Sequence, residues 1–368
     1  MSFTKRTLSL ILAALALAAQ PALAKDYLLA GTKPNKLHLI DAAARQVVKT
    51  LDIPSAPGPG PQVIVPSPDG KRAYVVTNRW ESVSGLDLDS GKEVFRTNLS
   101  RGDERVKVPF GLAISPDGKE LYVYESPVKL GLGEYQVQDT RIAVFDTAAG
   151  LDARPVRSFK APRRIIMLMT SADGQLLYGL GWDLYAFDPK SGELKETLPI
   201  RNWQRPNYAE PDVLDAWPQF EQSGIFSTPY FAARTDKDPS DPEAYKVGIL
   251  TLDLKTGDFA YKDFENLAVV IFSSVVNPVK PREIYAVYTQ LSKIDLGAGP
   301  ETGALLKRID LPHTYYAINI SADGQELYVG GAMNDIGVYS TQTLERIGEI
   351  KLPGGGDQAL ASLRVVRR

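Results

Sequence analysis

The stretch Ser115-Pro116-Asp117-Gly118-Lys119-Glu120-Leu121-Tyr122-Val123 reads as a tight turn followed by a β-strand. Proline presets φ for a turn, aspartate can accept a hydrogen bond from the backbone ahead of it, and glycine adopts positive φ without steric cost. Leucine, tyrosine and valine then favour a strand. The same pattern recurs at residues 67–75, 171–178 and 321–329. Four copies in one chain indicate a repeat protein.

A second recurring pattern is a short apolar segment that ends in Asp and is followed by a polar turn. Its end positions are Asp41, Asp87, Asp146, Asp188, Asp253 and Asp295, with Ser340 in the seventh place. They are separated by 46, 59, 42, 65, 42 and 45 residues, and the short spacings match a four-stranded propeller blade of roughly 40–50 residues. Helical periodicity is absent over any long window. The sequence therefore predicts an all-β, seven-bladed β-propeller of four-stranded blades, in which these aspartates cap turns and do not form a carboxylate site.

The two ends of the chain predict how the ring closes. The strands expected in three units are 27–30, 37–41 and 47–51 in the first, 110–114, 120–124, 141–146 and 155–160 in the third, and 315–320, 327–330, 336–340 and 346–352 in the seventh. The first unit lacks an inner strand, whereas residues 360–366 form a spare strand-like segment. We expect this C-terminal segment to become the inner strand of the N-terminal blade, which protects the sheet edges at the seam.

Three insertions interrupt the repeat, at residues 125–140, 199–223 and 235–244. Long loops on a rigid scaffold commonly carry recognition. The second insertion holds Trp203 and Trp217, with arginines nearby, which suits either an interface or a loop packed on its own apolar cluster. The segment His313-Thr314-Tyr315-Tyr316 precedes the inner strand of the seventh unit, and residues 332–335 form a turn in the same unit. Either group is a candidate pocket or a set of ordinary core residues.

Composition and the N-terminus restrict the classes of function. Lys5 and Arg6, an apolar run over residues 8–19 and a small-residue site ending at Ala24 predict a secretory signal peptide over residues 1–24, with a retained membrane anchor as the alternative. Residues 25–368 then form one propeller domain. The balance of 42 Lys and Arg against 44 Asp and Glu gives no support to nucleic-acid or membrane-surface binding. With no cysteine and only two histidines, neither a disulfide, a covalently attached haem nor a metal site is expected.

Three segments of this chain resemble the β subunit of quinohemoprotein amine dehydrogenase. They are Leu198-Pro199-Ile200-Arg201-Asn202-Trp203 with its continuation to Pro218, Asp310-Leu311-Pro312-His313-Thr314-Tyr315-Tyr316, and Ile350-Lys351-Leu352-Pro353-Gly354-Gly355. The resemblance extends over nearly all of the expected mature chain. It implies a periplasmic heterotrimer that oxidises primary amines to aldehydes and ammonia. In that complex a dihaem cytochrome c α subunit carries two c-type haems, and a small γ subunit carries cysteine tryptophylquinone.

For this chain the resemblance implies a scaffold that docks the two cofactor-bearing subunits. It places the chemistry in the γ subunit, so no catalytic, cofactor-binding or metal-binding residue is expected here. The candidates for contact with a partner or with the amine substrate are Trp203, Trp217, His313, Tyr315 and Tyr316. The alternative is a stand-alone periplasmic propeller, either a lactonase-like hydrolase or a non-enzymatic binding module. The shortage of histidine counts against a hydrolase that needs a metal cluster.

Overall fold

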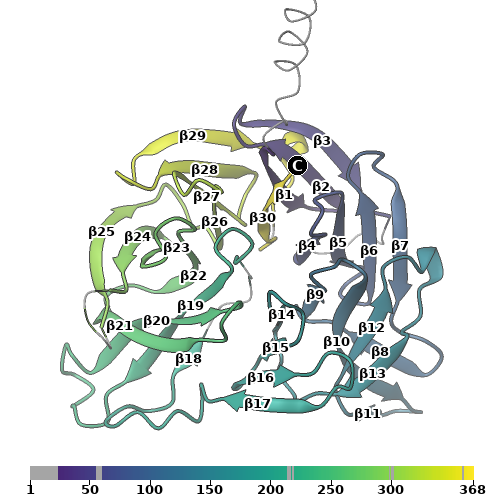
Figure 1. The fold of residues 1–368 in the computed structure, drawn as a ribbon, viewed down its shortest axis with the longest axis horizontal. Coiled ribbons are helices and arrows are strands. Elements are labelled where there is room, and N and C mark those ends of the chain that lie inside the picture. Colours follow the sequence, from purple (N-terminus) through teal and green to yellow (C-terminus); the bar gives the residue numbers. More distant parts are fainter. Residues whose placement is uncertain are drawn as a thin grey trace, which may run out of the picture.

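Seven antiparallel β-sheets form a ring around a central axis (Figure 1). The structure is a computed structural model that describes residues 24–54, 60–213, 217, 219–297, 299, 302–358 and 360–368. The predicted all-β, seven-bladed propeller is confirmed. The signal peptide expected at residues 1–24 lies, apart from its last residue, outside the described part. Within these ranges no helix is both long and apolar enough to cross a membrane.

The strands of each blade are given from the centre of the ring outward. The first three blades hold β30 (Leu363–Arg367), β1 (Asp26–Thr32), β2 (Lys36–Asp41) and β3 (Gln46–Asp52); β4 (Ile64–Pro66), β5 (Arg72–Thr77), β6 (Ser82–Asp87) and β7 (Glu93–Asn98); and β9 (Leu112–Ile114), β10 (Glu120–Leu130), β12 (Arg141–Asp146) and β13 (Arg157–Lys160). The third blade also contains β8 (Glu104–Lys107) and β11 (Tyr135–Val137), which both pair with β10. The fourth and fifth hold β14 (Met167–Thr170), β15 (Leu177–Leu180), β16 (Leu184–Phe187) and β17 (Leu194–Leu198); and β18 (Asp212–Val213), β19 (Ile225–Ala233), β20 (Tyr245–Asp253) and β21 (Phe259–Asn266). The last two hold β22 (Ile271–Val276), β23 (Glu283–Tyr288), β24 (Gln290–Asp295) and β25 (Ala304–Asp310); and β26 (Ala317–Ile320), β27 (Glu326–Gly330), β28 (Asp335–Ser340) and β29 (Arg346–Lys351). Two short 3-10 helices, η1 (Gly150–Asp152) and η2 (Pro353–Gly355), lie in connections.

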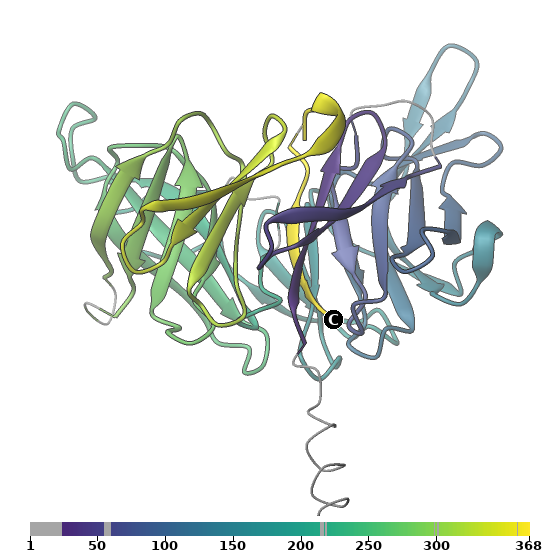
Figure 2. The same cartoon turned by 90° about the horizontal axis from the view of Figure 1, so that it is seen from above.

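The C-terminal strand closes the ring, as the sequence predicts. Strand β30 pairs with β1 in antiparallel register, from Asp26 opposite Arg367 to Ala30 opposite Leu363. The N-terminal and C-terminal strands therefore lie side by side in one sheet (Figures 1 and 2). The strand begins at Leu363, three residues later than expected, because Leu360 adopts a positive φ of 67°.

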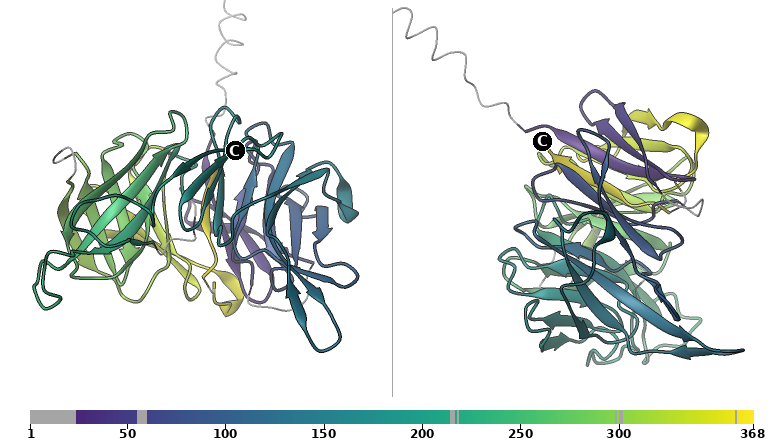
Figure 3. Two further views of the ribbon diagram at one scale, coloured as in Figure 1. Left: turned by 90° about the horizontal axis from the view of Figure 1, so that it is seen from below. Right: turned by 90° about the vertical axis from the view of Figure 1, so that its right-hand side faces the viewer.

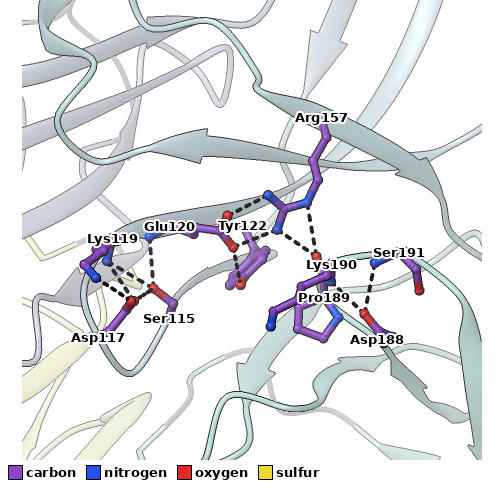
Figure 4. A network of polar contacts seen from close by, with 10 residues as sticks. All are labelled: Ser115, Asp117, Lys119, Glu120, Tyr122, Arg157, Asp188, Pro189, Lys190 and Ser191. Carbon is purple, nitrogen blue, oxygen red and sulfur yellow. Dashed lines mark hydrogen bonds and ion pairs between the residues drawn. The ribbon is translucent and has the colours of Figure 1, made fainter.

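The repeated turns are built from local hydrogen bonds, and Figure 4 shows one of each kind. In the first, the Ser115 hydroxyl donates to Asp117 Oδ1 (2.6 Å), which also accepts the Lys119 amide (3.1 Å). These bonds stabilise the carboxylate and lower the pKa of Asp117. In the second, Asp188 Oδ1 accepts the backbone N–H groups two and three residues ahead (2.8 and 2.9 Å). The predicted capping role is confirmed, and the Ser340 hydroxyl accepts backbone N–H groups in the same way.

Apolar side chains fill the spaces within and between neighbouring blades. Phe95 meets Tyr74 of its own second blade edge-on at 5.6 Å between ring centroids, and Phe145 of the third blade at 6.3 Å. Nearer the surface, hydrogen bonds from charged side chains join neighbouring blades. Arg157 pairs with Glu120 within the third blade and donates to the Pro189 carbonyl (2.8 Å) in a turn of the fourth (Figure 4).

The two faces of the ring differ because of the strand directions. In each blade the inner and third strands run one way and the second and outer strands run back. Both repeated turns therefore lie on one face, here called the turn face. The connections from second to third strand, and from each blade to the next, lie on the opposite face, here called the loop face. The β10–β11 hairpin projects from the loop face, away from the C-terminus (Figures 2 and 3).

Two insertions differ from the expected long loops. Most of residues 125–140 forms a hairpin, because β10 runs on to Leu130 and pairs there with β8 and β11. The excursion over residues 199–223 is not only a connection between blades, because it contains β18, the inner strand of the fifth blade. This strand pairs with β19 over two residues, Asp212 and Val213.

Candidate functional site

A cavity of about 980 Å³ opens on the loop face where the seventh blade meets the first. We call it the loop-face pocket. The connection after β25, the β27–β28 turn and the segment before β30 form its walls. Its lining includes His313, Thr314, Tyr316, Met333, Asn334 and Asp357. Both segments of the seventh unit that the sequence singled out, 313–316 and 332–335, therefore border one space.

A buried carboxylate, Asp335, organises the wall of this pocket. It is 4% exposed and accepts a hydrogen bond from the Tyr315 hydroxyl at 2.7 Å. Its other oxygen lies 2.9 Å from His313 Nε2, and His313 Nδ1 lies 2.8 Å from the Thr314 carbonyl. Both ring nitrogens of His313 thus face oxygen atoms of the protein.

The same hydrogen bond fixes the state of Tyr315. Burial, reinforced by the bond to Asp335, raises the pKa of Tyr315, so its hydroxyl keeps its proton and serves as a donor. This side chain is fully buried. Its role here is to hold Asp335 and, through it, His313.

Gln358, which the sequence analysis did not identify, holds the neighbouring turn in place. Its side chain is fully buried; the amide donates to the carbonyls of Ala332 and Asp335, and its oxygen accepts the Gly331 amide (3.0 Å). The segment before the closing strand is thereby attached to the β27–β28 turn. A lone glutamine beside a glycine-rich segment gives no sequence signal for this role.

Trp217 and Tyr316 meet beneath the pocket. Their rings stack at 6.3 Å, and both contact Phe272, at 5.2 and 5.1 Å. The Trp217 indole donates to the Leu360 carbonyl (2.8 Å). Four of the five candidate residues, Trp217, His313, Tyr315 and Tyr316, therefore lie in or directly below one region, although about a hundred residues separate the first from the others.

Trp203 lies elsewhere. It is 7% exposed, its indole donates to the Ala209 carbonyl (2.8 Å), and its ring meets Tyr208, Tyr230 and Tyr261 edge-on at 5.2–5.9 Å. Of the two alternatives for this insertion, the part around Trp203 packs on its own apolar cluster, in the fifth blade. Trp203 is not among the residues that line the pocket.

A second buried carboxylate, Asp263, anchors this insertion to β21. It accepts two bonds from the Arg205 guanidinium (2.7 and 2.8 Å) and one each from the hydroxyls of Tyr208 (2.6 Å) and Tyr230 (2.5 Å). Burial acts to raise the pKa of Asp263, but these four bonds outweigh it and the pKa is lowered. In the described part of the chain, no group of three or more His, Cys, Asp or Glu side chains is arranged to hold a metal ion.

Comparison with known proteins gives similarity in fold. No protein-family model matches the chain, and no curated protein matches it in sequence. Hydrazine synthase from Kuenenia stuttgartiensis superposes with a TM-score of 0.56 at 18% identity, covering 84% of this chain and 90% of that one. A protein of unknown function from Desulfotomaculum acetoxidans superposes with a TM-score of 0.58 at 10% identity, covering 93% of this chain and 98% of that one. At these identities both comparisons show a shared fold and nothing finer.

Proposed function

We propose that this chain is the propeller subunit of a periplasmic quinohemoprotein amine dehydrogenase. In this proposal it docks a dihaem cytochrome c subunit and a small quinone-bearing subunit, and the complex oxidises primary amines to aldehydes and ammonia. The sequence resemblance described above suggests the family. A chain without cysteine has no residue to which a c-type haem or a cysteine-linked quinone could be attached, so both groups would reside in the partners.

The observation that carries the docking role is the set of exposed aromatic residues on the loop face. Each of the three exposed aromatic residues in the described part, Tyr135, Trp182 and Tyr245, lies in or at the end of a connection between second and third strands. Leu132 at the hairpin tip is fully exposed, as is most of Val137. Exposed aromatic side chains gathered on one face mark an interaction surface.

Neighbouring arginine side chains fix the exposed ring of Trp182 on this face. The guanidinium groups of Arg164 and Arg201 each lie 3.9 Å from its ring centroid. Arg201 also pairs with Glu210 through Nε (2.6 Å). A planar aromatic ring between two cations loses little side-chain freedom on binding, and tryptophan and arginine dominate binding energy at interfaces.

In this proposal the loop-face pocket forms one wall of the substrate site. The quinone of the partner subunit supplies the amine oxidation. The residues of this chain shape the space: Tyr316 and Met333 offer apolar surface, and His313, whose two nitrogens are held by Asp335 and the Thr314 carbonyl, offers a fixed ring. Because Asp335 is anchored by Tyr315, the imidazole keeps its position when a ligand arrives.

Purification of the complex from its native host tests the proposal. We expect the chain to co-purify with a c-type cytochrome and a small quinone protein, and the fraction to oxidise primary amines. Tyr135→Asp in the hairpin should reduce co-purification by about tenfold or more, the effect of burying an unpaired charge in an interface. Val279→Asp is the matched control, because Val279 is also an exposed apolar residue but lies in a turn on the opposite face. A chain that purifies alone with full stability would contradict the proposal and favour the stand-alone propeller.

A further inference from the structure

A second cavity, of about 390 Å³, occupies the turn-face end of the central channel. It is surrounded by the closing strand β30, by the inner strands of the second, third and fourth blades, and by residues 220–224. Its walls are apolar where Val65, Leu112, Ile114 and Leu168 contribute, and Glu221 and Arg364 are the charged residues deepest in it. It lies at the opposite end of the channel from the loop-face pocket and shares no lining residue with it.

Arg364 is an unusual residue to find at this position. It is 2% exposed, on the inner strand that closes the ring. One of its terminal nitrogens, Nη2, forms an ion pair with Glu221. Its Nε and Nη1 have no hydrogen-bond partner among the described residues. A buried guanidinium with two unpaired nitrogens is costly, and proteins seldom keep one unless something else satisfies it.

Glu221, the partner of Arg364, lies on a segment outside the described strands. The described part of the inner strand of the fifth blade is Asp212–Val213, and residues 219–224 are not part of a strand. Around Glu221, the Gly224 amide donates to the Phe220 carbonyl (2.7 Å), and the Gln222 side chain donates to the Val365 carbonyl (3.3 Å). Moving the Glu221 carboxylate off Arg364 therefore breaks no strand pairing.

We propose that this cavity binds a small organic carboxylate with an apolar body, which displaces the Glu221 carboxylate from Arg364. Guanidinium and carboxylate form paired hydrogen bonds in a fixed planar geometry, and an incoming carboxylate can use the nitrogens that Glu221 leaves unpaired. The apolar body would lie along Val65, Leu112 and Leu168. Glu221 is then a built-in competitor that occupies the arginine when no ligand is present. The inference is independent of the proposed dehydrogenase role.

Titration calorimetry on the purified protein tests this with sodium hexanoate as the probe and hexanamide, of the same shape but neutral, as the comparison. We expect hexanoate to bind at least about tenfold more tightly than hexanamide, because a charge-assisted pair replaces a neutral hydrogen bond. Glu221→Gln should tighten hexanoate binding by removing the competitor. Arg364→Met should abolish it. Arg367→Gln is the matched control, since Arg367 lies at the mouth, is half exposed and pairs with Asp26 (3.6 Å).

Each alternative result has a definite meaning. Equal binding of hexanoate and hexanamide would show an apolar cavity without carboxylate selectivity and would overturn the proposal. Unchanged or weaker binding by Glu221→Gln would overturn the displacement step. If Arg364→Met does not fold, Arg364→Lys keeps the charge but not the planar fork, and hexanoate binding should fall by about tenfold or more. No binding of hexanoate at millimolar concentration to Glu221→Gln would refute the site.

Discussion

Mild acid should destabilise this protein through one buried histidine. His38 lies in β2 and is 0% exposed. Its Nε2 is 2.9 Å from the Thr32 hydroxyl and its Nδ1 is 2.9 Å from the Thr50 hydroxyl, so the neutral ring is fully hydrogen-bonded. Burial, and to a lesser degree the charge of Lys36, lowers the pKa of His38 from 6.5 to about 4.

The size of the effect follows from proton linkage. Below pH 6.5 the unfolded ring takes up a proton, whereas the folded ring stays neutral down to about pH 4. The contribution of His38 is therefore present in full above pH 6.5 and is lost as the pH falls from 6.5 to 4. The two pKa values, 6.5 and about 4, correspond to a loss of about 3 kcal/mol in the free energy of unfolding, with a slope approaching about 1.4 kcal/mol per pH unit.

Urea unfolding followed by tryptophan fluorescence at pH 7, 6, 5 and 4 measures this. The free energy of unfolding of the wild type should fall about 3 kcal/mol further than that of His38→Gln over this range. The difference between the two proteins isolates His38, because carboxylates titrate in both. His313→Gln is the control, since the sequence holds only two histidines. Parallel loss of stability in wild type and His38→Gln would refute the reasoning and show that the folded ring accepts a proton at an ordinary pH.

Three further predictions concern the turns, the fifth blade and the seam. Gly192→Ala should lower the free energy of unfolding in urea by about 1–3 kcal/mol, because φ of Gly192 is +75° and the new Cβ would lie 2.3 Å from Phe159. Gly133→Ala should lower it less, because Gly133 has a similar positive φ but open space around it. Asp263→Asn should lower stability by about 3–5 kcal/mol, because a buried guanidinium loses its partner, and a change under about 1 kcal/mol would contradict the assigned network. Deleting residues 360–368 should abolish cooperative thermal unfolding, since β1 loses its inner neighbour; an unchanged transition would show that the seam is dispensable.

Local patterns in the sequence predicted the fold because they describe contacts between residues close in the chain. Asp117 and Asp188 cap turns through N–H groups two or three residues ahead, so their role can be inferred from the local sequence. Repetition of such turns predicted the blades, and one predicted strand, 141–146, matches β12 residue for residue. The closing strand was predictable because a first unit without an inner strand and a spare C-terminal strand are complementary.

The candidate site was predictable only in part. The segment 313–316 was recognisable, because it departs from the repeat, and its neighbour Asp335 was in a turn already singled out. That Trp217 stacks on Tyr316 while Trp203 enters a separate cluster was not predictable, since both lie in one insertion with similar neighbours. Their destinations depend on which blade each part of the insertion meets.

The sequence by itself thus determined the repeat, the number of blades and the closure, because these rest on turns and strand patterns encoded within about ten residues of each other. The tertiary structure alone decided what fills and flanks the channel. Glu221 meets Arg364, and Trp217 donates to the Leu360 carbonyl, only after the ring has closed and brought residues 143 positions apart into contact. No local pattern relates the segments that make these contacts, so packing across the closed ring decides them.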